Sequence, residues 1–295
     1  MLEEAACGWV YREPGGIQLG QSRKINWAIA SVMALLHVGA VAALFTVNWQ
    51  AVLTAAVLYW MGISLGIGMG YHRLLTHRSF KTSKAVEYFL AVCGTLTLEG
   101  GPISWVGTHR LHHQKSDREG DPHTPRQGGF WAHMGWVLCG RSHHNDTEGM
   151  ARYAPDLGSS AFYRWLNTYH YVPLLVSAAV LAAVGGWPMF LWGVCFRVVL
   201  GLHSTWLVNS AAHMWGQRRF ATPDDSRNSW WVALLTFGEG WHNNHHAHPA
   251  SARHGLAWYE VDLTWMQIRL LQFAGLIKSA RVAQLTAQPA EAQAT

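Results

Sequence analysis

Clustered histidines constrain this chain more than any other feature of its sequence. Two segments each carry three histidines at positions i, i+3 and i+4, namely His109, His112 and His113, and then His242, His245 and His246. On a helix these positions share one face. Neutral imidazoles gathered on one face are typical ligands of iron, copper or zinc. The fold must therefore allow both helical faces to meet around metal.

A looser pair, His72 and His77, precedes both clusters and raises the total to eight histidines. Asn209 and His213 add a further pair at i and i+4. So many imidazoles exceed the need of one ion, which predicts two metals. The Asn209 amide could hold a metal-bound water, since it both accepts and donates hydrogen bonds.

The cysteines argue against other metal sites. The chain has four, Cys7, Cys93, Cys139 and Cys195, and they are widely spaced without a Cys-x-x-Cys pair. An iron–sulfur cluster or a zinc ribbon is therefore not expected, and we interpret the thiols as buried and idle.

Apolar runs surround the histidine clusters. Half of the residues are hydrophobic and only 13% are charged, against roughly 25% in an ordinary soluble domain. Four runs are candidates for membrane spans, at 27–47, 51–70, 172–186 and 189–212. Very short turns join them in pairs, whereas the apolar stretch 88–98 is too short and reads as an interfacial helix. The sequence predicts one all-α integral membrane domain with four transmembrane helices, in two hairpins, and a helical cap.

Charge orients this arrangement. Of the 22 Lys and Arg residues, only Arg197 lies inside a predicted span and none lies in the two short turns. The positive-inside rule then places both termini, the central loop and all histidine clusters on the cytoplasmic side. Arg197 must face protein or reach the interface. The basic residues form no stripe, so no nucleic-acid partner is expected, and the N-terminus lacks the basic region of a cleavable signal peptide.

The second run carries Gly62, Gly66 and Gly70 at four-residue spacing. Such spacing is typical of close helix packing. It could also leave room for a ligand chain beside the helix.

The histidine motifs resemble the three histidine boxes of membrane-bound fatty acyl desaturases, and are closest to the Δ9 branch of stearoyl-CoA and acyl-lipid desaturases. The boxes are His72-Arg-Leu-Leu-Thr-His77, His109-Arg-Leu-His-His113 and His242-Asn-Asn-His-His246. Gly120-Asp-Pro-His123, Gly129-Phe-Trp-Ala-His-Met-Gly-Trp136, Asn209-Ser-Ala-Ala-His213 and Gly238-Glu-Gly-Trp-His242 match as well. The resemblance covers about residues 25–275, and the tail 279–295 lies outside it.

This resemblance implies a di-iron centre, a bent acyl tunnel and O2 as co-substrate. The implied ligand set is His72, His77, His109, His112, His113, His213, His242, His245 and His246, with Asn209 through a water. An unactivated C–H bond has no acidic proton, so an oxidant made from O2 must break it. Two electrons must come from outside, from a ferredoxin or a cytochrome b5 type protein. The acyl carrier, whether CoA, acyl carrier protein or membrane lipid, stays open.

Two further sets of residues are predicted around this site. Asp117, Asp121, Glu99 and Glu239 are candidates to accept the second N–H of the ligand imidazoles, or to lie in solvent. Trp60 lies twelve residues before His72, roughly 18 Å along a helix axis, which suits the floor of the tunnel. Ser64 or Tyr59 could take this place instead. The isolated histidines are interpreted as structural or surface residues: His37, His143, His144, His170, His203 and His254.

Two other functions fit parts of the pattern. A related di-iron hydroxylase would insert oxygen instead of forming an alkene, and analysis of the product separates the two. A membrane metal transporter would carry ligands in broken helices at mid-membrane. Here the predicted spans contain His37, His203 and Arg197 but no carboxylate, which disfavours the transporter.

Overall fold

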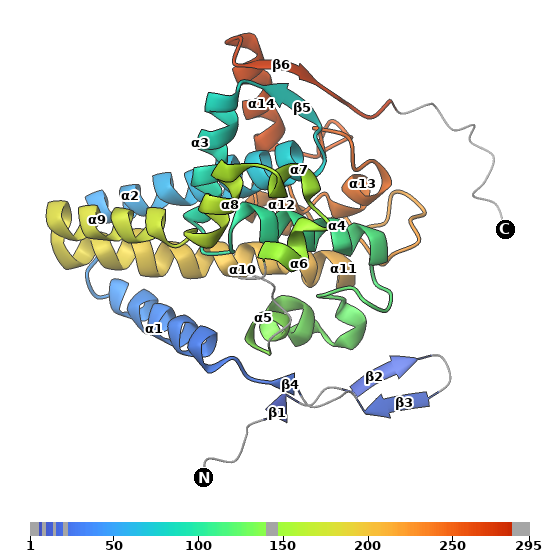
Figure 1. Ribbon diagram of the computed structural model, residues 1–295, viewed down its shortest axis with the longest axis horizontal. Coiled ribbons are helices and arrows are strands. Elements are labelled where there is room, and N and C mark those ends of the chain that lie inside the picture. Colours follow the sequence, from blue (N-terminus) through green and yellow to red (C-terminus); the bar gives the residue numbers. More distant parts are fainter. Residues whose placement is uncertain (1–5, 8–9, 14–15, 20–22, 140–146, 285–295) are drawn as a thin grey trace.

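A computed structural model describes residues 6–7, 10–13, 16–19, 23–139 and 147–284. The protein is mostly helical, as predicted, with long apolar helices at one end and a cap of shorter elements at the other (Figure 1). His143 and His144 lie outside the described residues.

Both helices of the first predicted hairpin are present and joined by a short turn, but the first packs against residues 191–196 and not along the second. Helix α1 (Trp27–Ala43) and helix α2 (Trp49–Tyr59) each begin at an asparagine, Asn26 and Asn48, whose side chain accepts a hydrogen bond from a backbone N–H of the first turn. Helix α2 continues without interruption into the π-helical segment η1 (Trp60–Thr76), giving one apolar helix of 28 residues. With 17 residues, α1 is shorter than the span predicted at 27–47.

The second predicted hairpin follows from one glycine. The apolar stretch Val172–Met214 is continuous in sequence, but Gly186 has a φ of +62° and reverses the chain. It contains α9 (Val172–Phe190), η4 (Leu191–Phe196), α10 (Arg197–Asn209) and α11 (Ala211–Met214). A Cβ on Gly193 would lie only 2.7 Å from Leu181 Cδ1, so the two arms pack closely (Figure 1). The Val172–Met214 stretch and the α2–η1 helix are the two described stretches long and apolar enough to cross a membrane.

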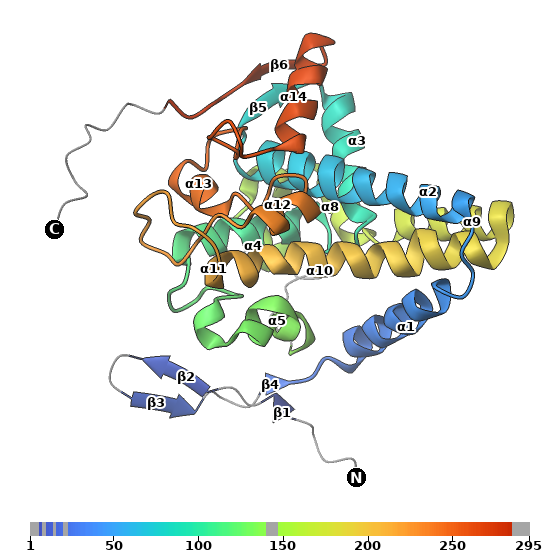
Figure 2. The same ribbon diagram turned by 180° about the vertical axis from the view of Figure 1, so that it is seen from behind.

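The cap gathers at the histidine-bearing ends of these helices, as two opposite views show (Figures 1 and 2). Its helical elements are α3 (Lys84–Thr95), α4 (Pro102–Lys115), η2 (Pro125–Gln127), η3 (Trp131–Gly135), α5 (Trp136–Leu138), α6 (Thr147–Ala151), α7 (Pro155–Gly158), α8 (Ala161–Thr168), α12 (Trp230–Leu235), α13 (His242–Ala247) and α14 (Leu263–Phe273). Most of the apolar stretch 88–98 therefore belongs to α3, a cap helix that ends at Thr95.

Short strands are the departure from an all-helical chain. They form three antiparallel pairs: β1 (Ala6–Cys7) with β4 (Arg23–Lys24), β2 (Val10–Glu13) with β3 (Gly16–Leu19), and β5 (Phe80–Thr82) with β6 (Ile277–Ala280). The last pair fixes the first residues of the predicted tail to the cap, because the Arg281 N–H also donates to the Ser79 carbonyl at 2.8 Å.

The glycines of the second run pack against a helix. A Cβ on Gly66 would lie 2.4 Å from the backbone N of Gly94, and one on Gly70 would lie 3.0 Å from the Leu90 carbonyl. Both neighbours belong to α3. The interpretation as close helix packing is confirmed, and the alternative of space for a ligand is wrong at these positions.

The buried charge of the second hairpin faces protein. Arg197 is 2% exposed, and its guanidinium donates to the carbonyls of Gly193 and Leu96. Cys93, Cys139 and Cys195 are buried, as expected.

Candidate metal centre

Local helical geometry aligns the histidines of each box. On α4 and on α13 the three histidines occupy positions i, i+3 and i+4 of an α-helix. The looser first pair uses the wider winding at the end of η1. There the His77 N–H donates to the His72 carbonyl at 3.1 Å, an i→i+5 bond that sets the two residues one turn apart.

The chain brings nine histidines into two groups. One group holds His72, His77, His109, His113 and His245, and the other holds His112, His213, His242 and His246. Within each group, one ring nitrogen per residue lies within 4.8 Å of every other. The groups adjoin, since the His113 and His246 rings stack with centroids 4.6 Å apart. All nine histidines proposed from sequence are therefore in the site.

Four carboxylates orient imidazoles of both groups. Each accepts a hydrogen bond from the Nδ1–H of one imidazole: Asp117 from His213 at 2.8 Å, Asp121 from His112 at 3.1 Å, Asp224 from His246 at 3.0 Å, and Glu239 from His72. A ring that donates through Nδ1 presents the lone pair of Nε2 on its opposite side.

The ring nitrogens of the four-histidine group are arranged as they would be around a bound cation. His213 Nε2 and His246 Nε2 lie 3.0 and 3.1 Å from His242 Nε2, whose single proton could satisfy only one of them. His112 Nε2 and His242 Nδ1 are buried without a hydrogen-bond partner. Lone pairs facing one another at this distance repel unless a positive ion lies between them, so this donor set suits a metal.

Burial keeps the imidazoles neutral and available. Desolvation, with the charges of neighbouring imidazoles, lowers the pKa of His109, His113, His242 and His245 well below the usual value. The carboxylates stay ionised. Burial alone would raise the pKa of Asp117, but its hydrogen bond from His213 lowers it to about 2.

The structure revises the predicted partners of the ligands. Asp117, Asp121 and Glu239 contact ligand imidazoles as expected. Glu99 does not, because it accepts a hydrogen bond from Trp105 Nε1 at 3.0 Å. Asp224 was missed by sequence reasoning, since it lies on an irregular loop between α11 and α12 where no periodicity points to a ligand.

A buried ion-pair network supports one of these carboxylates. Arg73 is fully buried and donates to Glu239 at 2.9 Å and to Asp262 at 3.0 Å. His254, expected to be structural or at the surface, is 1% exposed, and its ring lies 4.6 Å from that of His245. Sequence reasoning also missed Arg73, although it directly follows His72.

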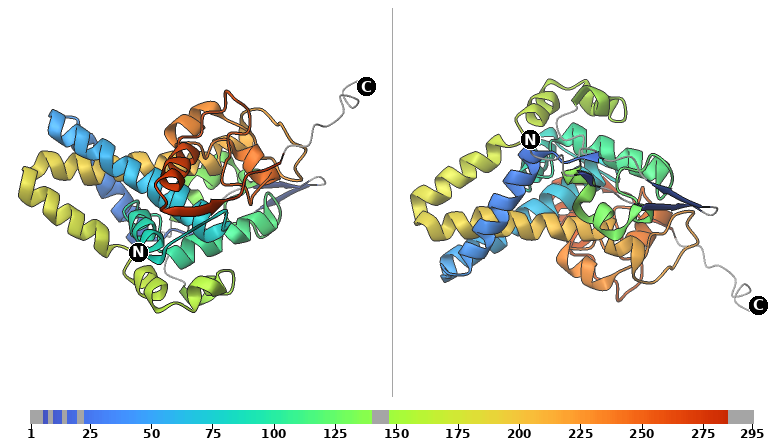
Figure 3. Two further views of the ribbon diagram at one scale, coloured as in Figure 1. Left: turned by 90° about the horizontal axis from the view of Figure 1, so that it is seen from above. Right: turned by 90° about the horizontal axis from the view of Figure 1, so that it is seen from below.

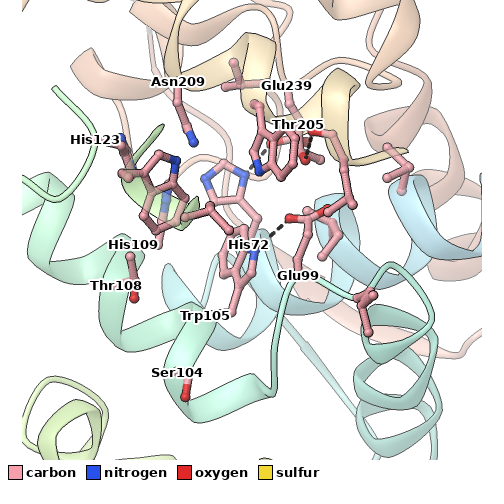
Figure 4. A pocket seen from close by; sticks show the side chains of 18 of the residues that line it. His72, Glu99, Ser104, Trp105, Thr108, His109, His123, Thr205, Asn209 and Glu239 are labelled. Carbon is pink, nitrogen blue, oxygen red and sulfur yellow. Dashed lines mark hydrogen bonds and ion pairs between the residues drawn. The ribbon is translucent and has the colours of Figure 1, made fainter. Parts of the chain in front are cut away.

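A largely apolar cavity of about 300 Å³ adjoins the histidines. Its lining comes from α1 (Ala28, Ile29, Val32, Met33), η1 (Ile63, Ile67, His72), α10 (Leu202, Thr205, Trp206, Val208, Asn209) and the cap, including Leu98, Glu99, Trp105, His109, His123, Trp136, His170, Thr236, Glu239 and His242. Figure 4 shows the Asn209 amide pointing into this cavity near His72, and the Trp105–Glu99 hydrogen bond at its wall.

The residues predicted for the tunnel floor lie outside the lining of this cavity. Trp60 Nε1 donates to Gln267 Oε1 at 3.2 Å, and Ser64 Oγ lies 3.1 Å from Thr264 Oγ1. Both side chains thus face α14, and neither lines the cavity. The predicted depth and face both assumed an α-helix, whereas η1 is π-helical. Ile63 and Ile67 provide the η1 wall of the cavity instead.

Comparison with known proteins identifies the family. The family profile described as fatty acid desaturase matches residues 48–271. The chain belongs to the fatty acid desaturase family. This match includes all nine histidines and Asn209, so both histidine groups lie within the part of the chain that matches the family.

Individual relatives are similar over most of their length. The sn-1 stearoyl-lipid 9-desaturase of Anabaena variabilis is 48% identical over 262 residues, covering 88% of this chain and 95% of the relative. The sn-2 palmitoyl-lipid 9-desaturase of Nostoc sp. (strain 36) is 44% identical, covering 88% and 91%. An icosanoyl-CoA 5-desaturase of Limnanthes douglasii is 45% identical, covering 90% and 73%.

Proposed function

We propose that this fatty acyl desaturase is an O2-dependent di-iron enzyme that introduces a cis double bond at Δ9 of a saturated acyl chain. The observation that carries this proposal is the meeting of two imidazole groups with an apolar cavity. His72, His109 and His242 belong both to the metal-binding groups and to the cavity wall. Two relatives named as 9-desaturases support the position of the double bond.

The residues of the chain would hold the metals, orient the imidazoles and exclude water from the cavity. One iron would be held by the five-histidine group, and the other by the four-histidine group with Asn209 through a water. Bound iron supplies the oxidising power from O2 that no side chain can provide. The four carboxylates would keep the Nε2 atoms of their partner imidazoles directed at the metals. The apolar wall made by Ile63, Ile67 and Leu202 holds a hydrocarbon chain and keeps water away.

We also propose the membrane arrangement. The two helical hairpins cross the bilayer as four spans, with the cap and both termini on the cytoplasmic side. The distribution of Lys and Arg supports this arrangement. Arg197 is the single one of these basic residues in the predicted spans, and it is buried in protein. A separate redox protein of the ferredoxin or cytochrome b5 type would deliver two electrons at the cap.

Expression in cells that lack unsaturated fatty acids tests the function. The expected product is a cis monoene with its double bond at carbon 9, measured by mass spectrometry of derivatised fatty acids. A hydroxylated fatty acid as the main product would support the related hydroxylase instead. Recovery of neither product from protein that carries iron would contradict both.

The proposed water anchor gives a graded prediction. Asn209→Ala is expected to lower activity less than His213→Ala, because it removes the holder of a water and not a direct ligand. Iron per chain and product per minute are measured for both purified variants. Equal and complete loss of iron in the two variants would contradict the role of Asn209.

Chain length should depend on the η1 wall. Ile63 is 2% exposed and lines the cavity, so Ile63→Phe is expected to fill space and shift products to shorter chains. Overpacking of this kind costs about 1–3 kcal/mol, which the folded protein can tolerate. Met61→Phe, on the same helix but outside the lining of the cavity, is the matched control. Trp60→Ala is expected to leave product length unchanged. A shift in Trp60→Ala alone would restore the floor predicted from sequence.

A further inference from the structure

Helix α1 packs most closely against the rest of the protein through its C-terminal half. A Cβ on Gly39 would lie 2.5 Å from Cys195 Sγ, and Ala43 is completely buried, so the C-terminal half packs tightly against η4. In the N-terminal half, Leu35 is 71% exposed and Met33 is the buried residue. Figures 1 and 2 show this half diverging from α10 towards the cap.

Polar contacts hold the N-terminal half of α1 at two places, at its start and at His37. The Asn26 N–H donates to the Leu138 carbonyl at 2.8 Å and fixes the start of α1 beside α5. Further along, His37 Nε2 lies 3.0 Å from His203 Nε2, and His203 Nδ1 lies 2.9 Å from His133 Nε2. This histidine chain joins α1, α10 and η3. The view from below in Figure 3 shows α1 crossing α10.

The cavity reaches the surface between these two contacts of α1. Ala28, Ile29, Val32 and Met33 form one face of α1 and line the cavity, and we call them the α1 portal. Ala28 and Val32 are exposed, whereas the remaining lining residues of the described chain, outside the α1 portal, are buried or half-buried. The mouth of the cavity therefore lies at the α1 portal, on the surface of a proposed membrane span.

Its depth in the bilayer follows from the helix. Lys24 and the exposed Trp27 stand at the start of α1 and are typical of a membrane–water boundary. Val32 lies five residues into the helix from Trp27, about 8 Å at 1.5 Å per residue. The portal then opens into the outer part of the hydrocarbon layer, where the acyl chains of glycerolipids begin. All four portal side chains are apolar and suit a hydrocarbon.

We propose that the α1 portal admits an acyl chain of a membrane glycerolipid sideways into the cavity, while the lipid head group stays at the interface. This inference rests on the proposed function and its membrane arrangement. It assigns a substrate route and a substrate class to this chain. The histidine chain and the Asn26 contact hold the two sides of the opening at a fixed separation.

Photolabelling tests the route without requiring turnover. The protein is placed in phosphatidylcholine vesicles containing a phosphatidylcholine whose stearoyl chain carries a diazirine, irradiated, and mapped by mass spectrometry. Adducts are expected on residues 28–33 and on Ile63 to Ile67. Val32→Trp is expected to lose the adducts at Ile63 to Ile67, whereas Leu35→Trp, a matched change on the lipid-facing side of α1, keeps them. Val32→Ala, which cannot block the opening, should also keep them.

Two results would overturn the portal. One is labelling of Ile63 to Ile67 in Val32→Trp at the wild-type level. The other is absence of cavity adducts from the lipid when a diazirine-bearing stearoyl-CoA, added from solution, labels the cavity in wild type and Val32→Trp alike. A variant that is labelled but makes no alkene would count against the proposed function and not against the portal.

Discussion

Replacing His242 by alanine is expected to reduce iron from about two ions per chain to about one and to abolish desaturation. His242 belongs to the group of four imidazoles, and its Nε2 lies within 3.1 Å of the Nε2 atoms of both His213 and His246. Its removal leaves three imidazoles and an open coordination position. Iron is measured in the purified, membrane-inserted variant by elemental analysis, together with product formation.

His248→Ala is the matched control for this experiment. His248 directly follows α13 but belongs to neither histidine group, and its ring packs against Phe220 instead. We expect wild-type iron content and activity from this variant. Two irons in active His242→Ala protein would contradict the assignment of the four-histidine group. One missing iron in both variants would point to a general folding defect of α13.

The gathering of the histidines could be predicted from sequence because each box obeys a local rule. His109, His112 and His113 share a face through helical geometry alone, wherever the helix lies in the fold. The carboxylates beyond them obey no such rule. Asp224 reaches His246 from an irregular loop, and no spacing between residues 224 and 246 reveals this contact. Buried Arg73 was missed for the same reason, since its partners lie more than 160 residues away.

The position of Trp60 shows a different limit of sequence reasoning. Its distance from His72 along the axis could be estimated, but the face it presents depends on winding. Segment η1 bonds i→i+5, so each residue turns through a smaller angle than in an α-helix. Over twelve residues the difference accumulates, and Trp60 faces Gln267 on α14. Hairpin turns were easier to predict, because Gly186 marks the reversal in the sequence itself.

Glu239→Ala is expected to weaken both the metal site and the fold. Glu239 accepts hydrogen bonds from His72 Nδ1 and from fully buried Arg73. Burial by itself would raise the pKa of Glu239, but the charge of Arg73 lowers it, so the residue is an anion in the folded protein. Removing one partner of a buried ion pair costs about 3–5 kcal/mol, and losing the carboxylate behind a ligand histidine lowers metal affinity about 10–100-fold.

Two variants separate these effects from each other. Glu239→Gln keeps an acceptor for one partner but removes the charge, so it should recover part of the stability and less of the iron affinity, measured by thermal unfolding and by competition with a chelator. Asp156→Ala removes a carboxylate from Arg78 and Arg110, whose side chains are 60% and 19% exposed. Because water solvates Arg78 and Arg110 keeps the Leu75 and Tyr153 carbonyls as acceptors, the effect on stability should be about 1 kcal/mol or less, with iron affinity unchanged. Equal losses of stability and affinity in Glu239→Ala and Asp156→Ala would show that Glu239 has no special role, since burial and the contact with His72 are what distinguish it.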